Sequence, residues 1–222
     1  LYIIGNPPFI GYSLQSVEQK EDMLNTLVDV NGKPYKQAGK IDYVSGWYYK
    51  ACKMMEAQPT IKAAFVSTNS ITQGEQVAGL WKPLVEQFGI HIDFAYPTFR
   101  WDSESNLKAH VHCVIVGFSK VPNSAPRLYK VDGTYKVCTH LNAYLVDGLD
   151  AFVESRNKPI CDVPQMITGN RPADGGHLII EAEEYEDFVA KEPGAIPYIK
   201  KLTGALEYIN NKKRYCLWLV GM

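Results

Sequence analysis

The chain has 222 residues, enough for one large domain or two small ones with a buried core. It carries 23 lysines and arginines against 24 aspartates and glutamates, so it lacks the basic excess of a free-standing nucleic-acid binder. The five cysteines lie far apart without a CxxC pair, which argues against a disulfide framework or a zinc cluster and favours a reducing cytoplasm. No apolar run approaches the roughly 20 residues of a membrane span, so we expect no membrane partner.

The first part of the chain alternates apolar strands with helices. Residues 1–5, LYIIG, are a continuous apolar run that predicts a short buried strand. Residues 11–40 are polar and predict a loop with one helical turn around residues 17–27. Apolar side chains recur at three- and four-residue spacing over residues 42–57, which predicts a helix that Pro59 closes.

A strand, a helix and two further strands follow. KAAFVSTNS predicts a strand, and residues 73–88 predict a helix that is dented at Pro83. IHIDFAYP, at residues 90–97, and HVHCVIVGF, at residues 110–118, predict two strands, the second of a type that is buried on both faces. This order of elements fits an α/β sheet with right-handed crossovers.

The sequence changes in character beyond residue 120. Residues 127–139 predict a hairpin that turns at Asp132-Gly133, and residues 141–153 predict a short helical connection. Further on, the acidic stretch EAEEYEDFVAKEP predicts a helix, and GALEYINNKKRYCLWLV predicts two strands around Asn210-Asn211. We therefore divide the chain into residues 1–120, a connector with a hairpin at 121–159, and a different segment at 160–222.

The tetrapeptide Asn6-Pro7-Pro8-Phe9 follows the first strand directly. Each proline fixes its own φ and lacks an N–H group, and a residue before proline is extended, so the tetrapeptide is a stiff exit from the strand. Ligands bind at the carboxyl ends of strands in open α/β sheets. A planar group with an exocyclic amine would find acceptors there in the Asn6 carboxamide and the main-chain carbonyls, and a ring in Phe9. The alternative is that the prolines only end the strand and Phe9 fills the core.

GNPPF resembles the (Asn/Asp/Ser)-Pro-Pro-(Phe/Tyr/Trp) motif of S-adenosylmethionine-dependent amino-methyltransferases, especially those that methylate adenine N6 in DNA. Longer stretches resemble MmeI-like enzymes, which join a restriction nuclease, a methyltransferase and a DNA target-recognition domain in one chain. These stretches are IDYVSGWYYKACKMM, AAFVSTNSITQGEQVAGLW, FAYPTFRWDSESNLKAHVHCVIVGF, MITGNRPADGGHLI and RYCLWL. The resemblance covers nearly the whole chain.

The resemblance implies an α/β fold. Residues 1–120 would form the C-terminal half of a Rossmann-like methyltransferase sheet, namely its last parallel strands plus an antiparallel strand. An α+β segment at residues 160–222 would begin the recognition domain. We expect the strands near residues 1–5, 62–68 and 90–96 to be parallel, and the strand near 109–118 to lie antiparallel between the second and the third.

The resemblance also implies that something is missing. Enzymes of this kind carry the Gly-rich turn and the acidic residue that bind S-adenosylmethionine upstream of the NPPF strand, and no GxG occurs in this sequence. We therefore expect a fragment that lacks most of the S-adenosylmethionine site and neither binds this methyl donor usefully nor transfers its methyl group when isolated.

The resemblance assigns catalysis to Asn6, Pro7, Pro8 and Phe9. The Asn6 side-chain oxygen and the Pro7 carbonyl would accept hydrogen bonds from the adenine amine and free its lone pair for attack on the methyl group. Phe9 would stack on the adenine, which must be flipped out of double-stranded DNA to reach the motif.

Other residues complete the predicted sites. Phe99 and Trp101 form the opposite wall of the base pocket or simply pack in the core. The cluster Lys200, Lys201, Lys212, Lys213 and Arg214 contacts DNA phosphates, although residues 160–222 carry seven basic and nine acidic side chains and an ordinary solvated surface explains them equally well. His110 and His112 share one strand face without a third ligand nearby, so we assign no metal.

The predicted function is site-specific methylation of adenine N6 within a restriction-modification system. Methylation of cytosine N4 or of a glutamine side chain uses the same motif, although the long sequence after residue 118 favours DNA as the substrate. A DNA-binding or scaffold role without chemistry is the alternative from a different class. The sequence leaves the recognised DNA site and the oligomeric state open.

Overall fold

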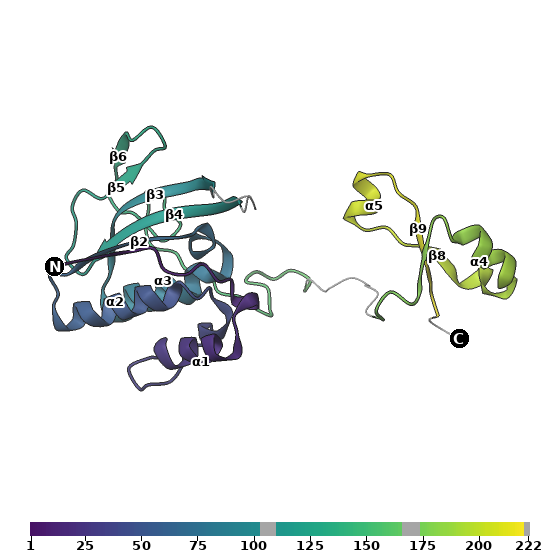
Figure 1. Cartoon of the computed structure of the whole chain (residues 1–222), viewed down its shortest axis with the longest axis horizontal. Helices are drawn as coiled ribbons and strands as arrows, with labels where there is room; N and C mark the ends of the chain where they lie inside the picture. The colour runs from purple at the N-terminus through teal and green to yellow at the C-terminus, as the bar shows by residue number, and fades with distance from the viewer. Residues whose placement is uncertain (103–109, 166–173, 220–222) are drawn as a thin grey trace. The chain divides into compact units, whose positions relative to one another are not determined.

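The computed structural model describes residues 1–102, 110–165 and 174–219 (Figure 1). The chain forms two compact units, Leu1–Asn157 and Lys158–Met222. In the described part of the chain, no helix is long and apolar enough to cross a membrane.

A mixed sheet organises the first unit. Within the described residues its strands are β1 (Tyr2–Gly5), β2 (Lys62–Thr68), β3 (His91–Asp102), β4 (His110–Ser119), β5 (Arg127–Tyr129) and β6 (Tyr135–Val137). Their spatial order is β1-β2-β4-β3-β5-β6. β1 pairs in parallel with β2, and β4 is antiparallel to both β2 and β3. The predicted sheet, with its antiparallel strand between the second and third parallel strands, is confirmed.

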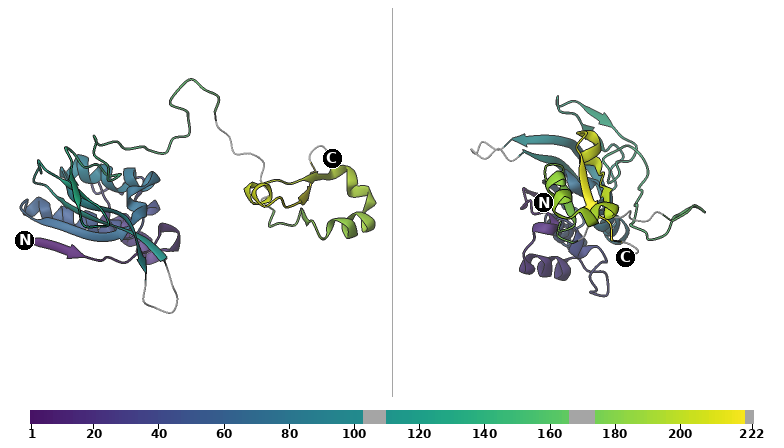
Figure 2. Two further views of the ribbon diagram at one scale, coloured as in Figure 1. Left: turned by 90° about the horizontal axis from the view of Figure 1, so that it is seen from above. Right: turned by 90° about the vertical axis from the view of Figure 1, so that its right-hand side faces the viewer.

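Two helices, α2 (Ser45–Ala57) and α3 (Gly74–Phe88), pack on one face of this sheet, and α1 (Val17–Thr26) packs against α2. Short 3-10 helices complete the first unit: η1 (Tyr12–Leu14), η2 (Ala38–Lys40) and η3 (Asn69–Thr72). Figures 1 and 2 show α2 and α3 side by side along the sheet. The helices α2 and α3 confirm the two helices predicted at residues 42–57 and 73–88. α1 is longer than the predicted single turn because Ser16 and Gln19 cap its start reciprocally, side chain to backbone.

Aromatic side chains fill the layer between the helices and the sheet. Tyr48 of α2 stacks on Phe118 of β4, with ring centroids 5.1 Å apart. Phe65 of β2 and Trp81 of α3 meet Tyr48 edge-on at 5.1 and 5.4 Å. All four side chains are buried, and the Tyr48 hydroxyl is hydrogen-bonded to Ser67 Oγ at 2.8 Å. Burial raises the pKa of Tyr48 above its ordinary value.

β1 differs from the predicted buried strand. Tyr2 and Ile4 are 73% and 81% exposed, whereas Ile3 packs against the core. Successive side chains of a strand point to opposite faces of the sheet, and α2 and α3 cover only the face to which Ile3 points. The apolar run therefore marks a strand correctly but overstates its burial.

The chain between residues 120 and 157 belongs to the first unit. β5 and β6 form the predicted antiparallel hairpin. β5 also pairs in parallel with β3, so the sheet continues beyond residue 120.

The predicted short helix at residues 141–153 is wrong. The Asn142 side chain binds backbone groups that would form hydrogen bonds in a helix. Its Oδ1 accepts from the amides of Tyr144 and Val146 at 3.0 and 3.3 Å. Its Nδ2 donates to the Leu149 carbonyl at 3.1 Å. Such local side-chain bonds compete with helix formation and leave this segment as a series of turns.

The second unit contains a small antiparallel sheet and short helices. Its described elements are β7 (Ile179–Glu181), α4 (Tyr185–Lys191), η4 (Pro193–Tyr198), β8 (Ile199–Lys201), α5 (Ala205–Ile209) and β9 (Arg214–Leu217). The strand order is β7-β9-β8. α4 confirms the predicted acidic helix, and the mixture of strands and helices confirms the predicted α+β character.

One of the two strands predicted around Asn210-Asn211 is wrong. The second is β9, but the first is the helix α5. The Glu207 carboxylate accepts from the Gly204 amide at 2.8 Å, which closes the first turn of this helix. That bond and the neighbouring Arg214 lower the pKa of Glu207. The capping carboxylate thus favours a helix in a segment whose apolar spacing fits either a helix or a strand.

We predict that Gly117→Ala destabilises the first unit. A Cβ at Gly117 would lie 2.1 Å from Cε1 of Phe94, its cross-strand partner on β3. Forcing an extra methyl group into a packed site costs about 1–3 kcal/mol. Urea unfolding of the chain should show this loss, and the change should cost much less in a Phe94→Ala background. Gly39→Ala is the control, because its Cβ would meet Leu24 at an ordinary 3.8 Å. Equal stability of Gly117→Ala and the parent would contradict this packing.

Candidate functional site

Three parallel strands end at one edge of the sheet. β1 leads into Asn6-Pro7-Pro8-Phe9, β2 leads into Asn69–Thr72, and β3 carries Phe99 and Trp101 near its end. β1 pairs in parallel with β2. β4 lies between β2 and β3 and is antiparallel to both, so β3 runs in the same direction as β2. The carboxyl ends of β1, β2 and β3 therefore share this edge. Ligands of open α/β sheets bind at such an edge.

The Asn6 side chain is available to a ligand. Asn6 and Pro8 are exposed, Pro7 is buried and Phe9 is half-buried. Among the described residues, neither the Asn6 carboxamide nor the Pro7 carbonyl has a hydrogen-bond partner. An asparagine that serves a turn normally bonds to nearby backbone, as Asn142 does. The two acceptors that the sequence singles out are therefore both uncommitted.

Contacts on both sides fix the path of the motif. Upstream, Gly5 pairs with Phe65 of β2. Downstream, the Tyr43 amide donates to the Ile10 carbonyl at 2.9 Å. The motif is thus a short bridge between two backbone anchors, with two prolines that limit its motion.

A cavity of about 330 Å³ lies against the motif. Its walls come from β1, from Phe65 of β2 and from α2. The lining residues are Ile3, Ile4, Gly5, Asn6, Pro7, Pro8, Trp47, Lys50, Ala51, Met54 and Phe65. Lys50 is the charged member of this set. A mostly apolar wall with a few polar groups is the usual form of a small-molecule site.

Phe99 and Trp101 lie farther along the edge. Cys113 of β4 pairs with Thr68 of β2 on one side and with Phe99 on the other, so about 10 Å of sheet separates Phe99 from β2. The rings of Phe99 and Trp101 lie 6.3 Å apart, and Trp101 is 53% exposed. Phe99 also lines a separate cavity of about 250 Å³ together with Tyr96, Pro97, Ile115, Lys130 and Val131. Their role as a wall of the base pocket stays a prediction.

The structure describes only part of the histidine pair. His112 lies opposite Arg100, and the His110 side chain lies outside the described residues. In the part of the chain that the structure describes, no cluster of three or more His, Cys, Asp or Glu side chains could hold a metal ion. All five cysteines are free thiols.

The second unit places four of the predicted basic residues close together. Lys200 and Lys201 lie on β8, which pairs with β9, while Lys212 and Lys213 immediately precede β9. The Leu202 amide donates to the Arg214 carbonyl at 2.8 Å, so the ends of these two strands meet. All four lysines are exposed. Their contact with phosphates stays a prediction.

Arg214 is committed within the second unit. Its guanidinium contacts the Glu207 carboxylate at 3.0 Å and Glu181 at 3.9 Å. Glu207 is buried, so this ion pair ties β9 to the start of α5. A phosphate would have to compete with both carboxylates for this side chain.

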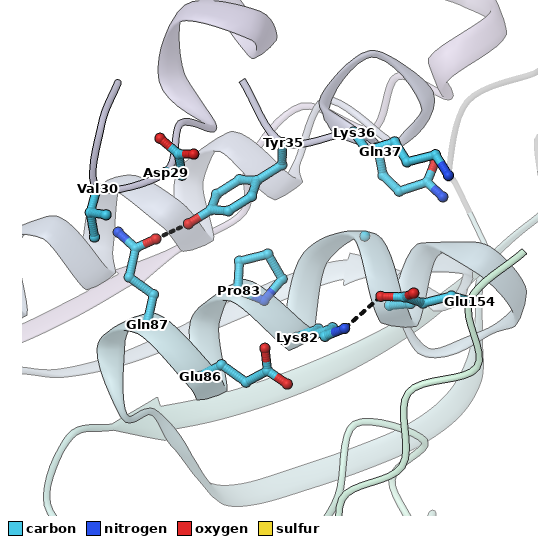
Figure 3. A pocket seen from close by; sticks show the side chains of 12 residues that line it. Asp29, Val30, Tyr35, Lys36, Gln37, Lys82, Pro83, Glu86, Gln87 and Glu154 are labelled. Carbon is cyan, nitrogen blue, oxygen red and sulfur yellow. Dashed lines mark hydrogen bonds and ion pairs between the residues drawn. The ribbon is translucent and has the colours of Figure 1, made fainter. Parts of the chain in front are cut away.

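A cavity of about 580 Å³ lies between residues 29–37 and α3 (Figure 3). The Tyr35 hydroxyl donates to the Gln87 side chain, and Lys82 pairs with Glu154 at 2.5 Å. Burial raises the pKa of Tyr35 to about 12. These polar groups bind one another, and none of the motif residues lines the cavity. We therefore place the candidate site at the motif.

A hydrogen-bonded network around Asp42, next to the segment that follows the motif, is not predicted from the sequence. Asp42 is buried and contacts Tyr12, Thr68, Ser70 and Gln76. A signal for it exists in the Ser-Thr-Asn-Ser run that ends the second predicted strand, because small polar side chains at that edge of a sheet commonly face a site.

Comparisons with known proteins extend this picture. Residues 1–130 match the family described as "MmeI, DNA-methyltransferase domain", and residues 147–221 match "MmeI, target recognition domain". The chain is 44% identical over 220 residues to "DNA methyltransferase A" of Bacillus subtilis (strain 168). The aligned region covers 99% of this chain and 24% of that protein. The chain thus spans about a quarter of this relative's length.

A solved structure is also similar. It is the structure of the Type IIL restriction-modification enzyme MmeI in complex with DNA, with 40% sequence identity and a TM-score of 0.89. The match covers 99% of this chain and 29% of that one.

We predict that Asn6→Ala leaves the stability of the chain within about 0.5 kcal/mol of the parent, because the exposed Asn6 side chain has no hydrogen-bond partner in the part of the chain that the structure describes. Asn142→Ala is the matched comparison. It removes three hydrogen bonds from a buried side chain and should cost about 1–3 kcal/mol. Urea unfolding of both variants measures the difference. A large loss for Asn6→Ala would identify Asn6 as a structural residue.

Proposed function

The chain belongs to the MmeI family of DNA methyltransferases, and on this premise we propose that it carries the motif that methylates adenine N6 in double-stranded DNA. The observation that carries the proposal is the exposed, unbonded Asn6 carboxamide at the carboxyl edge of the sheet. The Pro7 carbonyl next to it is equally uncommitted.

The chemistry follows from these two acceptors. The lone pair of the adenine amine is delocalised into the ring, so the amine is a poor nucleophile. Asn6 Oδ1 and the Pro7 carbonyl would each accept one of its two N–H groups, which favours a tetrahedral nitrogen with its lone pair free. Positioning and preorganised dipoles supply the rate enhancement, and no general base is needed before attack.

Phe9 supplies the surface that holds the base. Its ring is half-buried beside the acceptors and would stack on an adenine flipped out of the duplex. Stacking on an aromatic side chain contributes about 1–3 kcal/mol per base. Every base has such a face, so Phe9 captures the base and the acceptors orient it.

We propose S-adenosylmethionine as the methyl donor. The residues of this chain do not fit the donor by themselves. The sequence has no GxG turn, and the cavity beside the motif has Lys50 as its charged side chain. No residue of this chain is therefore assigned to the donor.

The second unit would position the DNA. We propose residues 160–222 as part of a target-recognition domain, with residues 121–159 joining it to the catalytic segment at 1–120. Exposed Lys200, Lys201, Lys212 and Lys213 would contact phosphates. We also propose that the protein acts within a restriction-modification system and in the cytoplasm. The five free cysteines agree with a reducing compartment.

We predict that Asn6→Ala abolishes methyl transfer. The experiment replaces the matching segment of the Bacillus subtilis relative with this chain and measures single-turnover methylation of duplex DNA. Loss of one stabilising group typically costs about 10²–10³ in rate, and here both acceptors act on one nitrogen. DNA affinity should stay within about threefold, because phosphate contacts supply most of it.

Asn31→Ala is the control for that experiment, since Asn31 is exposed and lies in a turn away from the motif. It should methylate like the parent. Near-normal turnover of Asn6→Ala, or an inactive parent chimera, would contradict the proposed function.

We predict that Lys→Gln changes at residues 200, 201, 212 and 213 weaken DNA binding equally for all sequences. Each lost phosphate contact should reduce the slope of log K against log salt by about 0.9. Fluorescence anisotropy of the chain with duplex DNA across a salt series measures this slope. The control changes four exposed lysines of the first unit, Lys20, Lys33, Lys40 and Lys62. An equal effect of both sets would show that only net charge matters.

A further inference from the structure

A buried carboxylate lies beneath the segment that follows the motif. Asp42 Oδ1 accepts from the Tyr12 amide at 3.1 Å and from Gln76 Nε2 at 2.8 Å. Asp42 Oδ2 accepts from Thr68 Oγ1 at 3.3 Å and from Ser70 Oγ. The residue is 6% exposed, and all four of these donors are neutral.

These partners come from three separate parts of the fold. Tyr12 begins η1, Thr68 ends β2 and Ser70 follows it in η3, and Gln76 is in the first turn of α3. Two more bonds reinforce the junction: the Asp42 amide donates to Gln76 Oε1 at 2.9 Å, and the next amide, that of Tyr43, binds the carbonyl of Ile10. Asp42 therefore joins the segment after the motif to the carboxyl end of the neighbouring strand.

We propose that Asp42 is a positioning residue that aims the Asn6 and Pro7 acceptors. Pairing with β2 holds the chain at Gly5, and Asp42 holds it again at Tyr12. The few residues between these anchors include two prolines, so fixing both ends leaves the motif little freedom. The inference rests on the function proposed above, because it assigns Asp42 a role in that reaction.

The arrangement differs from a hydrogen bond that only stabilises the core. The buried bond between Tyr48 and Ser67 joins α2 to β2 and contacts no part of the motif segment. Burying a carboxylate among neutral donors is costly, and a core position has no need of it. The two Asp42 oxygens instead accept from the amide that begins η1, from the hydroxyls at and after the end of β2, and from Gln76 of α3.

Two substitutions at Asp42 test whether its hydrogen bonds hold the motif segment in place. In Asp42→Asn, Oδ1 keeps the Tyr12 and Gln76 donors, and Nδ2 can donate to the Thr68 and Ser70 hydroxyls, which also accept. Asp42→Ala loses all four bonds. Tyr48→Phe is the control, because it removes one buried hydrogen bond of the same unit without touching the motif segment.

The first measurement is amide hydrogen exchange of the 222-residue chain by NMR. In Asp42→Ala the Tyr12 amide should exchange at least about tenfold faster, while the Phe65 amide in β2 stays within about threefold. Asp42→Asn and Tyr48→Phe should keep Tyr12 near its parent rate. Uniform acceleration of all amides in Asp42→Ala would overturn the proposal, and so would an unchanged Tyr12.

The second measurement is methyl transfer by the chimera described above. Asp42→Ala should lower kcat about 10²-fold with KM for DNA within about threefold, because misplaced catalytic groups cost rate rather than affinity. Asp42→Asn should recover most of the loss. A loss only in proportion to unfolded protein, without rescue by Asn, would overturn the proposal. If the parent chimera is inactive, the proposed function fails, and the exchange of Tyr12 still decides whether Asp42 fixes the motif segment.

Discussion

The parallel pairing of β1 with β2 is the constraint on which the rest of the site depends. Because of this pairing, the chain leaves the sheet at Asn6 on the same edge as the end of β2, and the two strand ends are neighbours. The carboxylate of Asp42 can then join the two exits, since one oxygen reaches the Tyr12 amide and the other reaches the hydroxyls after β2. Without this pairing the motif would be an ordinary proline-rich loop.

The packing behind the sheet explains why this edge is stable. Tyr48, Phe65, Trp81 and Phe118 lock α2 and α3 against the strands, and Gly117 leaves room for Phe94 on the opposite face. These four aromatic side chains therefore support the strand ends without using the Asn6 side chain, which is exposed. The Asn6 side chain can therefore stay exposed, without a hydrogen-bond partner among the described residues.

Features encoded by short-range periodicity could be predicted from the sequence, and features set by single hydrogen bonds could not. The spacing of apolar residues in α2 and α3 gave the helices, and the resemblance gave the order of the sheet. Asn142 and Glu207 each redirect a segment through side-chain bonds that periodicity does not reveal. The Asp42 network joins residues about 30 positions apart, so only the folded chain shows it. The position of the motif was predictable because its prolines restrict the backbone locally.

In the proposed reaction the exposed Asn6 carboxamide and the Pro7 carbonyl receive the amine of a flipped adenine. Mass spectrometry of nucleosides from duplex DNA, after incubation with the chimera and S-adenosylmethionine, tests this most directly. We expect N6-methyladenine at the sites that the chimera modifies, with none in a reaction without the methyl donor. The appearance of N4-methylcytosine, or the absence of any methylated nucleoside, would contradict it.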